Sequence, residues 1–426
     1  MATGDKRKTA SGNPFWRHVG ALFAGTGASQ ILTLAAIPFL TKLYEPEEYG
    51  TFAAFLAMSM IIGTIATGRY NLAIILPGED REGASLVTLS TGVTLLCSII
   101  AAGATMVWPE EICKLSNNMD LMPWLPFLPL AIFLYGITQI LEGWSNRKAR
   151  YKRMSAGRLI MVLLIVSIQL SLGVKGVEGG LMIGTLIGQS VSLAIIITLA
   201  FMKDDLANLI KQGLPRLKTM AKEYSSHPLH LVPAHGACIL YLQLPVLLIS
   251  SIFGKGAAGW YGLSFRIVLL PTQTLATSIG TVYRQHAAEN FRKTGEFLAL
   301  YKKTLFSTAV LSILPFLALL LFIDDLVLLF LGEKWKEAGE LAQILSILGW
   351  FCFFSQPVDK GSIIVGKTGY IICWHVARLL ALVAAFFICS LTLPGLSKMV
   401  VAFSIVGIIF YLVDLFFGYH FAKGKT

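Results

Sequence analysis

The stretch KDDLANLIKQGLPRLKTMAKEYSSHPLH, residues 203–230, is the longest interruption in an otherwise apolar sequence. It is rich in lysine and arginine, and it divides the 426-residue chain into two halves of similar length. On either side of it, apolar runs of about 18 to 25 residues recur, and each is long enough to cross a bilayer as a helix. Because 55% of the residues are hydrophobic and only 14% are charged, we predict an integral membrane protein.

The fold class that follows is all-α, with about twelve transmembrane helices. Six precede the basic segment and six follow it, which predicts two six-helix lobes around a central cavity. The N-terminal lobe would comprise residues 1–202, the cytoplasmic linker 203–230 and the C-terminal lobe 231–426. We place the spans near residues 19–41, 50–68, 85–107, 121–143, 156–174, 180–202, 231–252, 259–283, 304–323, 339–357, 371–392 and 399–420.

The positive charge is distributed unevenly between the two sides of the predicted membrane. Of the 35 Lys and Arg residues, 26 fall in or beside connections on the side of the termini and 7 on the opposite side. Cytoplasmic loops collect positive charge, so we expect both termini to be cytoplasmic. The net charge of +11 therefore reflects membrane topology and does not indicate a nucleic-acid partner.

An internal repeat links the two halves. A shift of 209 residues places Gly27 on Gly236 and Gly50 on Gly259, and it also aligns aromatic residues after the second glycine pair. Repeats with an even number of spans have the same orientation and are related by an axis along the membrane normal.

One arginine lies inside the apolar stretch GWYGLSFRIVLLPTQTL, residues 259–275. Arg266 is expected about 10 Å below the outer surface, where a charge is costly and faces protein or water. At helical spacing it belongs to a polar face made of Gly262, Arg266, Gln273, Thr277, Gly280 and Arg284. Such a face suits a helix that lines an aqueous cavity, and the alternative is an internal ion pair with Asp359 or Asp414.

Two further arginines lie at or within the predicted spans. Arg378 shares a helix face with His375, and its alternative role is an ion pair with Asp414. Arg69 lies at the end of the second span. Its alternative role is that of an anchor whose charge reaches back to the membrane surface. Because guanidinium binds phosphate through paired hydrogen bonds, these arginines favour an anionic cargo. The predicted substrate-binding residues are Arg266, Arg378, Arg69 and Gln273.

No sequence pattern supports an enzyme, a cofactor or a bound metal. The external connections are all shorter than about 20 residues, which leaves no room for an external catalytic domain. The stretch GSIIVGKT, residues 361–368, matches a phosphate-loop pattern, but it joins two spans and lacks the strand that such a loop requires. We interpret it as a cytoplasmic turn and predict a transporter.

Five stretches in order resemble the Wzx-type O-antigen and polysaccharide flippases. They are PFLTKLYEPEEYGTFAAFLAM with GRYNLAIILP, WSNRKARYKRMSAGRLI, HLVPAHGACILYLQLPVLLISSIFG, GWYGLSFRIVLLPTQTLATSIG and FLGEKWKEAGELAQIL. This family lies in the superfamily that also holds multidrug and toxin extrusion (MATE) transporters and the lipid II flippase. The resemblance implies a MATE-like, two-lobed fold and a cationic cavity that contains Arg266 and Arg378.

The resemblance also implies a cargo and a location. The cargo would be an undecaprenyl-diphosphate-linked oligosaccharide, moved from the cytoplasmic to the periplasmic leaflet of the bacterial inner membrane by alternating access. The glycan polymerase machinery is a possible partner, and a drug antiporter of the same fold is the alternative. A proton or sodium gradient could drive net transport, with Asp359, Asp414, Glu142 and His375 as coupling candidates.

Overall fold

The computed structural model describes residues 14–359, 361–392 and 395–424, and these residues contain no strand. Residues 1–13 of the predicted N-terminal lobe and 425–426 of the C-terminal lobe lie outside the described residues. Ten helices in the described ranges are long and apolar enough to cross a membrane. The expected all-α membrane fold is therefore confirmed.

The helices follow the predicted spans. The long helices are α1 (Pro14–Leu43), α2 (Pro46–Ala66), α3 (Asp80–Val107), α5 (Leu128–Arg147), α6 (Tyr151–Val174), α7 (Gly180–Asp204), α10 (Val232–Thr294), α11 (Leu298–Leu331), α12 (Lys336–Ser355), α14 (Thr368–Thr392) and α15 (Leu396–Ala422). The short ones are η1 (Tyr70–Ile75), α4 (Pro109–Leu115), η2 (Met119–Phe127), α8 (Leu206–Gly213), η3 (Leu214–Arg216), α9 (Leu217–Glu223), η4 (His227–Leu231), η5 (Glu333–Trp335), η6 (Gln356–Val358) and α13 (Gly361–Ile364).

The number of separate spans differs from the prediction at one place. Two predicted spans lie within α10, whose two segments meet at Gly254, where φ is 84° and ψ is 173°. Glycine has no Cβ, so it adopts this non-helical conformation readily. The first predicted span, residues 19–41, lies within α1, a helix of 30 residues.

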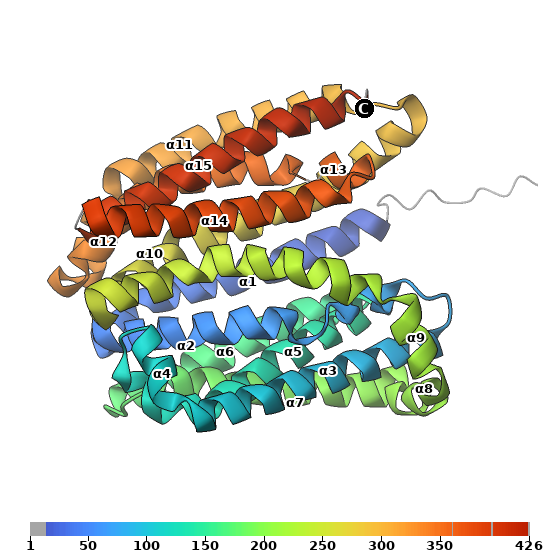
Figure 1. Ribbon diagram of the computed structural model, residues 1–426, viewed down its shortest axis with the longest axis horizontal. Coiled ribbons are helices and arrows are strands. Elements are labelled where there is room, and N and C mark those ends of the chain that lie inside the picture. The colour runs from blue at the N-terminus through green and yellow to red at the C-terminus, as the bar shows by residue number, and fades with distance from the viewer. Residues whose placement is uncertain (1–13, 360, 393–394, 425–426) are drawn as a thin grey trace, which may run out of the picture.

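Figure 1 shows how the long helices are arranged. Helices α11, α14 and α15 lie on one side, α3, α5, α6 and α7 lie on the other, and α1, α2 and α10 lie between them. The start of α1 and the C-terminus lie at the same end, together with α8 and α9 (Figure 1). The lobe boundaries at residues 202 and 231 stay a prediction.

The two halves meet backbone to backbone where α2 passes the second segment of α10. A Cβ on Gly50 would lie 1.7 Å from the carbonyl oxygen of Lys255, and a Cβ on Gly259 would lie 1.9 Å from that of Pro46. Both pairs of positions differ by 209 residues, the shift that aligns the halves. The contact is thus reciprocal, as a two-fold relation between the repeats requires.

Further contacts join the halves at the same end. We call these contacts, together with the Gly50–Gly259 contact, the seam. The indole of Trp335 donates to the carbonyl oxygen of Thr41 at 3.1 Å, and its ring lies 5.0 Å from that of Tyr49. Lys334 pairs with Glu45 at 2.9 Å, across the same two halves. The seam therefore joins the halves through buried and exposed polar contacts in addition to the glycine contact.

The basic segment 203–230 packs on the first half through α8 and α9. The Ser85 hydroxyl donates to the carbonyl oxygen of Gly213 at 2.9 Å, and Arg216 pairs with Glu82. A hydrogen bond from Arg81, with the Arg216 charge nearby, holds the pKa of Glu79 below its usual range. The segment is therefore attached to the start of α3.

The phosphate-loop-like stretch forms a short helix and a turn between two longer elements. Residues 361–364 form the short helix α13, and Gly366 takes a positive φ of 79° in the turn that follows. The amide of Lys367 donates to the carbonyl oxygen of Ser362 at 2.7 Å, which closes that turn. The interpretation as a turn between two helices is confirmed.

Candidate functional site

Arg266 lies on the second segment of α10, beside the seam. One turn earlier, a Cβ on Gly262 would come within 2.9 Å of the Ala53 side chain on α2. The hydroxyl of Tyr49, a residue that is 3% exposed, interacts electrostatically with the guanidinium. This hydroxyl is buried and has no hydrogen-bond partner in the described part of the chain.

No carboxylate neutralises Arg266 within the described residues. It forms neither an ion pair nor a hydrogen bond with any of them, although its side chain is only partly exposed. The predicted alternative, an ion pair with Asp359 or Asp414, is not formed in this structure. Since an unpaired charge is costly at membrane depth, such an arginine is a strong candidate for ligand binding.

The predicted polar face continues from Arg266 into the second half of the molecule. Thr277 accepts a hydrogen bond from the Gln356 amide at 3.2 Å. Gly280 is buried, and a Cβ there would lie 3.2 Å from Pro357. The face therefore packs against η6 at its far end, and only the part near Arg266 lies beside the seam.

Arg378 is enclosed by aromatic rings. Its guanidinium carbon lies 3.7 Å from the ring centre of Tyr241, 4.6 Å from that of Tyr411 and 4.9 Å from that of Trp374. The side chain is buried and forms no ion pair with a described residue. Asp414, its predicted alternative partner, instead accepts a hydrogen bond from the Tyr370 hydroxyl at 2.9 Å. The aromatic faces thus replace a carboxylate as the stabilising partner.

Arg378 and Gln273 line one small cavity. It encloses about 30 Å³ between α10, α12, α14 and α15, and Tyr261 contributes to the same wall. A cavity of this size holds a water molecule or two. A diphosphate does not fit there in this conformation.

Arg69 is fixed inside the first half. Its backbone takes a positive φ of 57°, and its guanidinium donates to the carbonyl oxygen of Thr64 and the side-chain oxygen of Gln139, both at 3.2 Å. Only 7% of the residue is exposed, so it does not reach out to the surface as an anchoring arginine would.

The coupling candidates fall into two groups. Asp359 and Asp414 both act electrostatically on the Tyr370 hydroxyl, so the fold brings these two acids near one group. The ring centre of His375 lies 4.9 Å from that of the neighbouring Trp374. In the described ranges, no group of three or more His, Cys, Asp or Glu side chains could hold a metal ion.

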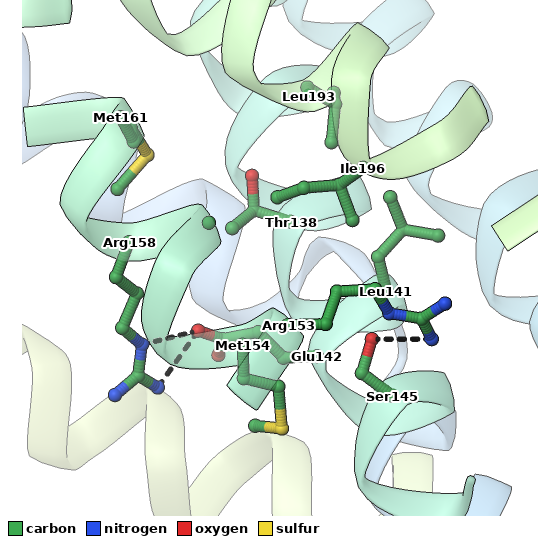
Figure 2. A pocket seen from close by; sticks show the side chains of 11 residues that line it. Thr138, Leu141, Glu142, Ser145, Arg153, Met154, Arg158, Met161, Leu193 and Ile196 are labelled. Atoms are coloured by element: carbon green, nitrogen blue, oxygen red, sulfur yellow. Dashed lines mark hydrogen bonds and ion pairs between the residues drawn. The ribbon is translucent and has the colours of Figure 1, made fainter. Parts of the chain in front are cut away.

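Glu142 belongs to the first half and pairs with Arg158 at 2.8 Å. Figure 2 shows the two side chains joined across a cavity of about 30 Å³ between α5, α6 and α7. In the same view Arg153 reaches toward Ser145, to whose hydroxyl it donates at 3.1 Å. Glu142 is therefore separated from the two acids of the second half.

Sequence reasoning missed a buried ionic cluster around Asp204. This carboxylate is fully unexposed and pairs with Arg153 at 2.6 Å and Arg150 at 3.5 Å. It also accepts a hydrogen bond from the indole of Trp144 at 3.2 Å. The sequence feature that could have revealed this cluster is the acid at the end of the sixth span, together with the run of arginines in the connection before the fifth span.

Comparison with known proteins places the chain in a family. The model of a family described as polysaccharide biosynthesis protein matches residues 39–340. The chain belongs to that family. Lipopolysaccharide biosynthesis protein WzxC of Escherichia coli (strain K12) is 21% identical over 374 residues, which cover 85% of this chain and 70% of that protein. The resemblance to Wzx-type flippases is thereby confirmed.

Solved structures of the superfamily share the fold. A multidrug resistance MATE family transporter in an inward-facing conformation superposes with a TM-score of 0.70 at 14% identity, covering 92% of this chain and 93% of that one. The lipid II flippase MurJ in an inward closed conformation gives 0.69 at 18% identity, covering 93% and 86%. These identities establish the MATE-like fold and nothing about cargo.

Proposed function

We propose that this protein is a flippase that moves an undecaprenyl-diphosphate-linked oligosaccharide, the repeat unit of O-antigen or another surface polysaccharide, from the cytoplasmic to the periplasmic leaflet. The proposal places it in the bacterial inner membrane with both termini cytoplasmic. Family membership supports a role in polysaccharide export. The observation that carries the proposal is Arg266, a guanidinium without a carboxylate partner among the described residues, beside the seam.

The chemistry of the cargo fits that position. A diphosphate is doubly charged and offers oxygens that a guanidinium binds through two parallel hydrogen bonds. The diphosphate of a bound cargo would supply the negative charge that neutralises Arg266. A cationic drug, the alternative cargo, would be repelled by the charge of Arg266, which no described residue neutralises.

Movement of the halves follows from the contacts at the seam. The reciprocal Gly50–Gly259 contact involves backbone alone, so the halves can part there with little rearrangement of side chains. Opening the seam would break the Lys334–Glu45 pair and the Trp335 hydrogen bond and expose Arg266 to the external side. Closing the seam, while the halves part at the cytoplasmic side, would expose Arg266 to that side, as alternating access requires.

Net export needs a driving force because moving a lipid-linked sugar between leaflets is nearly neutral by itself. Consumption by the polymerase machinery outside would supply one, and a proton or sodium gradient would supply another. For a gradient, Asp359 and Asp414 are favoured over Glu142 and His375 because both act on the Tyr370 hydroxyl. Collapse of the proton and sodium gradients separately, in vesicles that carry out transport, would distinguish the two sources.

The decisive experiment measures lipid-linked oligosaccharide in the inner leaflet of a deletion strain complemented with variants. Arg266→Ala should accumulate the lipid inside and abolish surface glycan, and Arg266→Lys should restore part of it. Arg292→Ala, which removes an exposed arginine of the same helix, is the matched control and should export normally. Normal surface glycan with Arg266→Ala would refute the proposal.

A further inference from the structure

A groove between α6 and α7 lies outside the proposed transport path. It has a volume of about 400 Å³, and its walls come from α6, α7 and the turn before α6. Neither α2 nor the second segment of α10, which form the seam, contributes to it. The basic lining residues are Arg150, Lys152, Arg153 and Lys203, and the apolar ones include Ile160, Ile195, Ile196 and Leu199.

The basic end of the groove keeps an excess of positive charge. Asp204 neutralises part of it by pairing with Arg153 and Arg150. Lys152 and Lys203 are exposed, and neither forms an ion pair within the described ranges. The Nε of Arg153 is buried and has no acceptor among the described residues. Of these four basic side chains, two pair with the single carboxylate of Asp204, and two form no ion pair among the described residues.

The backbone at this end also favours an anion. Helix α6 begins at Tyr151, directly after Arg150, and no side chain caps its first amides. Unpaired amides at the start of a long helix attract negative charge. They lie in the same turn as three of the four basic side chains, so backbone and side chains act in the same direction.

The other end of the groove has the character of a lipid-facing surface. Ile160 and Ile195 are 36% and 40% exposed on two helices long and apolar enough to cross a membrane. Helices α6 and α7 pack closely beneath it, since a Cβ on Gly157 would lie 2.9 Å from Ile196. The groove therefore joins a cationic pocket to an apolar channel along the bilayer.

We propose that this groove binds an anionic phospholipid of the surrounding leaflet. Its phosphate would contact Lys152, Lys203 and the first amides of α6, and an acyl chain would lie along Ile160 and Ile195. Basic pockets between membrane helices bind anionic lipid headgroups in this way. The transported lipid is not the occupant, because the groove takes no residue from the seam. The inference holds whatever cargo the protein carries.

The test uses the full-length protein purified in detergent. Phosphatidylglycerol or phosphatidylcholine is titrated in, and binding is followed by native mass spectrometry and by the thermal unfolding midpoint. Wild type should bind phosphatidylglycerol more tightly than phosphatidylcholine. The double variant Lys152→Gln/Lys203→Gln should bind phosphatidylglycerol about thirtyfold more weakly, because each lysine at a membrane surface contributes about fivefold.

The matched control is Lys211→Gln/Lys218→Gln, which removes two exposed lysines from α8 and α9 outside the groove. It should bind phosphatidylglycerol as wild type does. Equal weakening in both double variants, or equal binding of the two phospholipids by wild type, would overturn the proposal. Undecaprenyl phosphate is the last arm, and displacement of bound phosphatidylglycerol by an equimolar amount would assign the groove to the cargo and overturn it too.

Discussion

Arg266 and Arg378 are both guanidinium groups on apolar helices of the second half, yet their surroundings differ. Arg378 is enclosed by the rings of Tyr241, Trp374 and Tyr411. Arg266 interacts with the Tyr49 hydroxyl and forms no ion pair in the described part of the chain. The difference separates an arginine that stabilises the fold from one that is available to a ligand.

The largest expected effect is the loss of transport in Arg266→Ala. One hydrogen bond to a charged group contributes about 1.5 to 3 kcal/mol, so export should fall at least about tenfold. Stability should change by less than about 0.5 kcal/mol, because no hydrogen bond or ion pair to a described residue is lost. Export in complemented cells and thermal unfolding in detergent measure the two quantities. A large loss of stability would instead show that Arg266, like Arg378, stabilises the fold.

The second effect concerns the backbone contact beside Arg266. In Gly50→Ala, the added methyl would meet the Lys255 carbonyl oxygen, and only a backbone shift could relieve this clash. We expect export to fall several-fold while the aromatic cage around Arg378 stays intact. Near-ultraviolet circular dichroism reports on the cage. Gly27→Ala is the control, since nothing lies within 4 Å of that position. Equal export by both variants would count against a role for this contact in transport.

The third effect is on stability and concerns Arg378. Arg378→Ala removes a cation from three aromatic faces, and a desolvated cation–π contact contributes about 2 kcal/mol or more. The unfolding midpoint should fall clearly, and it should fall less in Arg378→Lys, which keeps the charge. Unchanged stability in the alanine variant would show that the rings do not hold the guanidinium.

The smallest effect is expected from Tyr49→Phe. The hydroxyl is buried without a hydrogen-bond partner in the described ranges, so its removal should leave stability unchanged or slightly higher. Export should change by no more than about threefold if Arg266 binds cargo without help from this hydroxyl. A loss as large as that of Arg266→Ala would make Tyr49 part of the binding site.

The fold was largely predictable because hydrophobic length dictates membrane spans. The two spans within α10 were placed correctly by composition even though the structure joins them at Gly254. The glycine repeat at positions 50 and 259 indicated equivalent positions. That these glycines contact each other could not be predicted, because a repeat fixes equivalence and not proximity.

The candidate site was predictable only in part. Hydropathy marks Arg266 and Arg378 equally, since each is a charge inside an apolar run. The aromatic cage of Arg378 comes from three different helices, α10, α14 and α15, and no local pattern joins them. The Asp204 cluster was missed for the same reason, because its partners lie about fifty residues earlier in the chain.

By itself the sequence determined that this chain crosses a membrane as helices, because apolar length and charge placement act locally along each span. It also predicted that arginines lie within the apolar spans. Only the tertiary structure decided which of them has a partner, because burial and pairing depend on what the neighbouring helices bring to the same point. That distinction leaves Arg266 at the seam as the residue to test first.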